Sequence, residues 1–196
     1  MNAIFAVFSI PIVILNLLGG ISSGIWLAIL GEWEIIGIGI AALFITSFAI
    51  PLVLAPSILL VMPGMYFYDK ARFLYYIFIL LANLYIVTVI TVWCFGVLYY
   101  FIGRVTSDNY IPVLIWSYGM ATGPITWMAS KEQDSPASII MAVFTQIGYI
   151  LMIIAALFLT TYLFDLIVIF SIAMLMCLFF MYKAGLDASR EARAVD

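Results

Sequence analysis

The sequence contains no histidine, only two cysteines, and few charges: 7 Lys or Arg and 10 Asp or Glu in 196 residues. Without histidine, the chain lacks the commonest general base and metal ligand. Cys94 and Cys177 form no CxxC pair and are too few to build a zinc site. No basic cluster indicates nucleic-acid binding. We therefore predict a protein that is not an enzyme, with no catalytic residues, no metal, no cofactor and no nucleic-acid partner.

The charges that are present lie in narrow islands separated by long apolar segments. Uncharged runs cover residues 1–31, 35–68, 73–103, 109–130, 135–164 and 166–182. The hydrophobic fraction is 67% and the mean hydropathy is +1.27. A hydrocarbon core about 30 Å thick needs roughly 20 helical residues to cross it. We therefore predict an all-α, polytopic transmembrane helical bundle in the cell membrane, with the lipid bilayer as its partner.

Four spans are predicted directly, at about residues 4–30, 35–62, 73–102 and 110–128. A single helix over 137–182 would be about 69 Å long, twice what a bilayer needs. We expect two helices there, with a turn at 160–165. Six spans place six of the seven basic side chains on one side, whereas five spans divide them three against four. The positive-inside rule therefore favours six spans with both termini cytoplasmic.

The predicted organisation is a transmembrane domain over residues 1–183 and a short charged cytoplasmic tail over 184–196. Two sets of small residues follow the helical repeat in the membrane domain. In the first span Asn16, Gly20 and Gly24 are four residues apart, and Gly119 and Gly123 repeat the spacing in the fourth. Such GxxxG faces let membrane helices pack closely. The packing is either within one subunit or between subunits, so a homo-oligomer or a membrane-protein partner is expected.

The fourth span is more polar than the others and contains a break. Pro124 follows Gly123, and proline removes a backbone donor and clashes one turn back. The carbonyls near Gly119 and Met120 are therefore expected to lose partners, beside the hydroxyl of Thr122. Irregular backbone in a membrane survives only against protein or a watery cavity. The break is either part of a solute path or a packed kink.

The second span contains three prolines, at positions 51, 56 and 63. Each proline removes one helical hydrogen bond, and neighbouring helices must then support the freed backbone. We therefore predict a bent helix that ends near Pro63.

Three amides lie in separate apolar spans: Asn16, Asn83 and Gln146. They are predicted to form either a path for a neutral solute or an interhelical hydrogen-bonded contact. Asp165 lies beside the expected fifth-to-sixth turn. It is predicted to cap the following helix, and the alternative is ion or proton handling.

Two functions follow from these features. The first is a small transporter or channel-like protein for an uncharged or weakly polar solute, indicated by the polar, broken fourth span. The alternative is a non-transporting membrane scaffold or accessory subunit whose small-residue faces bind other membrane helices. A continuous polar path through Asn16, Asn83, Thr122 and Gln146 would favour transport, and a dry packed bundle would favour the scaffold.

Overall fold

A computed structural model gives the fold, with backbone described for residues 2–131, 136–158, 162–176 and 178–179. Side chains are described for residues 14–126, 142–158, 162–176 and 178–179. Within these ranges the chain is helical and contains no strand. The helices are α1 (Asn2–Ile29), α2 (Trp33–Phe67), α3 (Arg72–Ile102), α4 (Tyr110–Lys131), α5 (Pro136–Phe158) and a sixth helix, Leu163–Met176. The predictions of an all-helical chain and of two helices within 137–182 are confirmed.

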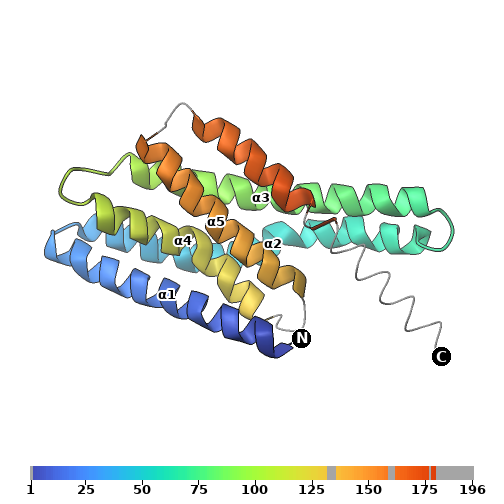
Figure 1. Ribbon diagram of the computed structural model, residues 1–196, viewed down its shortest axis with the longest axis horizontal. Helices are drawn as coiled ribbons and strands as arrows, with labels where there is room; N and C mark the ends of the chain where they lie inside the picture. Colours follow the sequence, from blue (N-terminus) through green and yellow to red (C-terminus); the bar gives the residue numbers. More distant parts are fainter. Residues whose placement is uncertain (1, 132–135, 159–161, 177, 180–196) are drawn as a thin grey trace.

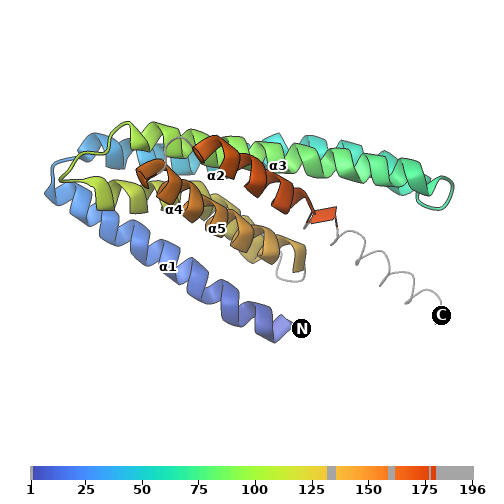
Figure 2. The ribbon, with the colours of Figure 1, turned by 45° about the horizontal axis from the view of Figure 1, so that its top comes forward.

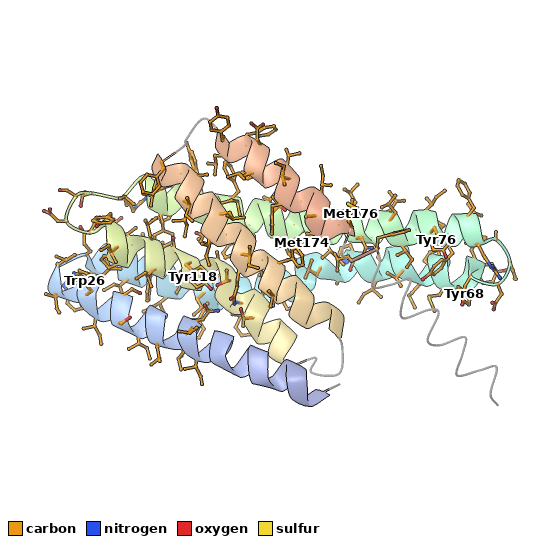
Figure 3. The ribbon with its side chains drawn as sticks, viewed as in Figure 1. Trp26, Tyr68, Tyr76, Tyr118, Met174 and Met176 are labelled. Carbon is orange, nitrogen blue, oxygen red and sulfur yellow. The ribbon has the colours of Figure 1, made fainter. Side chains whose placement is uncertain are left out.

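Consecutive helices run antiparallel and pack side by side (Figure 1). α1 lies along α4, α2 forms a hairpin with α3, and α5 packs on α4 (Figure 2). The hairpin extends well beyond the ends of α4 and α5 (Figures 1 and 2). Tyr68 and Tyr76 lie on this extension (Figure 3). The main core forms where α3, α4, α5 and the sixth helix meet, around Cys94, Val113 and Tyr149.

The turn from α1 to α2 depends on Gly31, which has a positive φ of 81°. The Gly31 amide donates to the Ala28 carbonyl at 3.1 Å, and the Glu32 amide donates to the Leu27 carbonyl at 2.9 Å. This pair of bonds is the Schellman motif, which ends a helix by satisfying its last carbonyls. A side chain at position 31 would strain this backbone, so glycine fixes where α1 ends.

α2 continues through all three of its prolines to Phe67, so the predicted end near Pro63 is wrong. Contact with α3 explains the continuation. The Cβ of Phe78 on α3 lies 3.1 Å from where a Cβ would stand at Gly64, so the two backbones approach closely there. Close packing along the hairpin supports helical backbone where proline has removed a bond.

α2 buries mostly small and polar residues beside Ile35 and Ile50, and it exposes large apolar ones. Its buried residues include Gly39, Thr46 and Ser57. Phe48 and Leu52 are instead 76% and 74% exposed. Water-soluble proteins rarely expose large continuous apolar surfaces, and small or polar residues are typical of contacts between membrane helices.

α2 and α3 are long and apolar enough to cross a membrane, with 35 and 31 residues and mean hydropathies of 2.4 and 2.3 in their best windows. At roughly 1.5 Å per residue they are about 52 and 46 Å long. Only 17% of the apolar window of α2 is buried within the molecule, and 39% of that of α3. Most of this apolar surface therefore faces outward.

Candidate functional site

A polar junction joins α1, α4 and α5 through one hydroxyl. The Thr126 Oγ1 accepts hydrogen bonds from the Asn16 Nδ2 at 3.2 Å and from the Gln146 Nε2 at 3.1 Å. The same oxygen donates to the Thr122 carbonyl at 2.7 Å. A hydroxyl has one donor and two acceptor positions, so all three are used. The sequence predicted that Asn16 and Gln146 could meet, but it did not identify Thr126 as the residue between them.

Asn83 is not joined to this junction by a hydrogen bond. It lies on α3 with 0% exposure, and among the described residues neither of its amide atoms has a partner. The Oδ1 of Asn16 is also buried without a partner in the same set. The described chain therefore contains a three-helix amide–hydroxyl contact, and no bonded chain of polar groups links Asn16, Asn83, Thr122 and Gln146.

The break predicted in the fourth span is not an interruption of the helix, since α4 is helical from Tyr110 to Lys131, and the segment around Pro124 is enclosed by protein. Thr122 is 0% exposed, Met120 is 5% exposed, and Gly119 and Pro124 are buried. The Thr122 hydroxyl donates to the Tyr118 carbonyl at 2.8 Å, one turn back in the same helix. A threonine hydroxyl that bonds to the carbonyl one turn back often bends its helix, and proline favours a bend as well.

One carbonyl near Pro124 accepts a hydrogen bond from a side chain of another helix. The Nε1 of Trp93 on α3 donates to the Ala121 carbonyl at 3.1 Å. Ala121 stands three residues before Pro124, next to the Met120 carbonyl that proline deprives of its helical donor. The freed backbone around Pro124 is therefore supported by a neighbouring side chain, which the sequence did not predict.

In each predicted glycine pair, one glycine has a neighbouring side chain within 4 Å of the Cβ position and the other does not. At Gly24, a Cβ would lie 3.2 Å from the Trp116 ring, and at Gly123 it would lie 3.8 Å from a Leu43 methyl. At Gly20 and Gly119, a Cβ would meet no atom within 4 Å. Gly24 is thus the position of close packing on α1, and Gly20 leaves space.

Asp165 lies in the first turn of the sixth helix, at its third residue, and its side chain is exposed. A carboxylate at this position meets the positive end of the helix dipole. The sequence predicted a cap just before the helix, and the residue instead falls inside the first turn because the helix begins at Leu163.

A second polar site, which was not predicted from the sequence, joins the α1–α2 turn to the α3–α4 loop. The Asn109 Nδ2 donates to the Glu32 Oε1 at 3.1 Å and to the Arg104 carbonyl at 3.3 Å. Its Oδ1 accepts from the Thr106 amide at 2.8 Å. Asn109 is 2% exposed. Its position directly before a helix, where asparagine is favoured, was the available signal.

The chemistry open to these sites is hydrogen bonding, by neutral groups at the Thr126 junction and by an amide with the Glu32 carboxylate at Asn109. Within the described part of the chain, no group of three or more His, Cys, Asp or Glu residues could hold a metal ion. The junction offers amides and hydroxyls, none of them beside a base that could activate a nucleophile.

The chain matches no known protein family, and no curated protein or solved structure shows significant similarity to it.

Proposed function

We propose that this protein is a multi-pass cell-membrane protein with six spans and both termini in the cytoplasm. The apolar exterior of α2 and α3 supports this proposal, because in water it would leave a large hydrophobic surface exposed. The antiparallel order of the helices gives each one the direction that alternating spans require (Figure 1).

The charged residues support the same topology. Arg104 lies 4.0 Å from Glu34, and Asn109 binds Glu32, so the α1–α2 turn and the α3–α4 loop meet at one end. Lys70 lies in the α2–α3 turn, at the opposite end of the hairpin. The positive-inside rule then assigns the Lys70 end to the cytoplasm.

Within the membrane, we propose that the protein acts as a non-transporting scaffold or accessory subunit. The observation that carries this proposal is the closed state of the polar junction: the hydroxyl of Thr126 uses all its bonding positions, and Thr122 beside it is fully buried. A solute path needs polar groups left free for the solute, whereas here the Thr126 hydroxyl and the two amide nitrogens bind one another, and the Asn16 Oδ1, which has no partner among the described residues, is buried.

The exterior offers surfaces on which other membrane helices can pack. Gly37 on α2 and Gly96 on α3 are exposed, and a Cβ at either position would meet no atom within 4 Å. Exposed glycines let the backbone of another helix approach closely. Such a helix could come from a second copy of this chain or from another membrane protein.

A transporter or channel for an uncharged solute is the second candidate, and Asn83 is the observation that favours it. A buried amide without a partner carries a cost of roughly 1–3 kcal/mol. A functional role as a solute ligand would explain why that cost is retained.

Reconstitution into liposomes separates the two proposals. Stopped-flow light scattering would measure glycerol and urea permeability in liposomes with and without the full-length protein. The scaffold proposal expects equal permeability. Glycerol or urea flux that depends on the protein and is lost in Asn83→Leu, with Val92→Leu on the exposed face of α3 as the control, would instead establish transport.

The association itself is tested at the exposed glycines. Gly37→Leu should leave the free energy of unfolding near that of the wild type, because the added side chain meets open space. It should weaken association measured by fluorescence energy transfer between labelled copies, or by cross-linking in native membranes. A chain that remains single in both assays would contradict the scaffold proposal.

A further inference from the structure

α2 and α4 both contain proline inside a continuous helix, and α3 donates a hydrogen bond to each of them three residues before a proline. The Trp93 Nε1 donates to the carbonyl of Ala121, three residues before Pro124 in α4. The Tyr85 hydroxyl donates to the carbonyl of Val53, three residues before Pro56 in α2.

Proline gives this position its significance. The residue four before a proline loses its helical donor, and the ring pushes the preceding turn open. The carbonyl three before the proline lies in that opened turn and has a second lone pair available. In both helices, an aromatic side chain of α3 binds this carbonyl.

α3 is suited to bind both proline-containing segments. Its 31 residues contain no proline, so it is a continuous helix between α2 and α4. Tyr85 and Trp93 are eight residues apart, which places them roughly 80° apart around the helix axis. They therefore face different neighbours from a single element.

The segment of α4 just beyond Pro124 also contacts α1 and α5. Thr126 lies two residues beyond Pro124 and holds both Asn16 and Gln146. A change of angle at Pro124 would therefore displace the attached parts of α1 and α5 together with the end of α4.

We propose that α3 acts as a latch for two proline hinges, one in α4 and one in α2. The latch is a side-chain hydrogen bond from α3 that holds the proline-containing segment in place. Trp93 holds the hinge at Pro124 closed, and Tyr85 holds the hinge at Pro56 closed. Release of the Trp93 bond lets the end of α4, with α1 and α5 attached, move relative to the α2–α3 hairpin. This device is independent of whether the protein acts as a scaffold or a transporter.

Hydrogen–deuterium exchange of the full-length protein in lipid nanodiscs tests the latch. Trp93→Phe removes the donor and keeps an aromatic ring. It should raise amide exchange in α4 around Pro124 about fivefold, the factor expected for one net hydrogen bond, and leave α2 around Pro56 unchanged. Tyr85→Phe should produce the reverse pattern. Trp26→Phe, on the exposed face of α1, is the control and should change neither region.

A double-variant cycle separates a latch from ordinary packing. In a Pro124→Ala background the turn regains its own donor, so Trp93→Phe should change exchange less than twofold. An equal effect of Trp93→Phe with and without Pro124 would overturn the proposal, and so would a uniform rise over the whole chain or no rise at all. If Trp93→Phe does not fold, Tyr85→Phe with and without Pro56→Ala tests the same latch in α2, with the same outcomes deciding it.

Discussion

The indole of Trp116 lies so close to Gly39 that a Cβ at position 39 would clash with the indole Nε1. The other edge of the same ring faces Gly24, where a Cβ would stand 3.2 Å away. One α4 side chain therefore packs against glycines of both α1 and α2. Glycines on two consecutive helices leave room for a single large ring, and the ring fixes how closely three helices approach.

Gly39→Ala should lower the free energy of unfolding by about 1–3 kcal/mol, because the ring of Trp116 must move to admit the methyl group. Gly37→Ala, two residues earlier and exposed, is the matched control. It should be neutral or stabilising by up to about 1 kcal/mol, since alanine favours helix and meets open space. SDS titration in mixed micelles would measure both. Equal stability of the two variants would show that the Trp116 contact is not tight.

Thr126→Val should destabilise the protein by about 1–3 kcal/mol. It removes the hydroxyl that binds two amides, and each bond between membrane helices is worth roughly 0.6–1.7 kcal/mol. Thr126→Ser keeps the hydroxyl and should remain within about 0.5 kcal/mol of the wild type. The same titration distinguishes them, and a valine variant as stable as the serine variant would show that the junction contributes no net stability.

The helices could be predicted from the sequence because charges and turn residues mark their ends. Gly31 follows the end of α1 and the Asp69–Arg72 island lies at the turn between α2 and α3, while α5 ends at Phe158 and the sixth helix begins at Leu163. The end of α2 was predicted wrongly because Pro63, judged from the local sequence alone, indicates the end of a helix. The packing of Gly64 against α3 overrides that signal, and tertiary contacts of this kind are not visible in one helix alone.

The polar junction could be predicted only in part. The presence of Asn16 and Gln146 in separate apolar spans indicated an interhelical contact, but which residue they share depends on the relative heights of three helices. The same limit applies to Trp116 and Gly39, and to Trp93 and Ala121. Each is a pairing between helices, and its register is set by the packing of whole helices and not by any local motif.

Asn109→Ala should destabilise the protein by about 1–3 kcal/mol. Asn109 is buried, and its amide bonds both to the Glu32 carboxylate and to the loop backbone, where a bond to a charged group is stronger than a neutral one. Asp108→Ala is the neighbouring control: Asp108 is exposed and accepts only the Ser107 hydroxyl among the bonds described, so its loss should cost no more than about 0.5 kcal/mol. Equal thermal unfolding temperatures of the two variants in detergent would contradict the prediction that the hydrogen bonds of Asn109 stabilise the protein.

The six-span topology makes a prediction that can be checked in intact cells. Single cysteines would replace exposed residues in a background without Cys94 and Cys177, and an impermeant thiol reagent would be applied from outside. Ser107→Cys and Asp165→Cys should react, because the α3–α4 loop and the start of the sixth helix belong to the outer end. Asp69→Cys, in the α2–α3 turn, should react only after the membrane is permeabilised. Since Asp69 and Ser107 flank opposite ends of one helix, α3, labelling of both from outside would mean that α3 does not cross the membrane. A reversed pattern would keep α3 as a span and invert the orientation, so that the basic side chains near Lys70 would face outward against the charge rule.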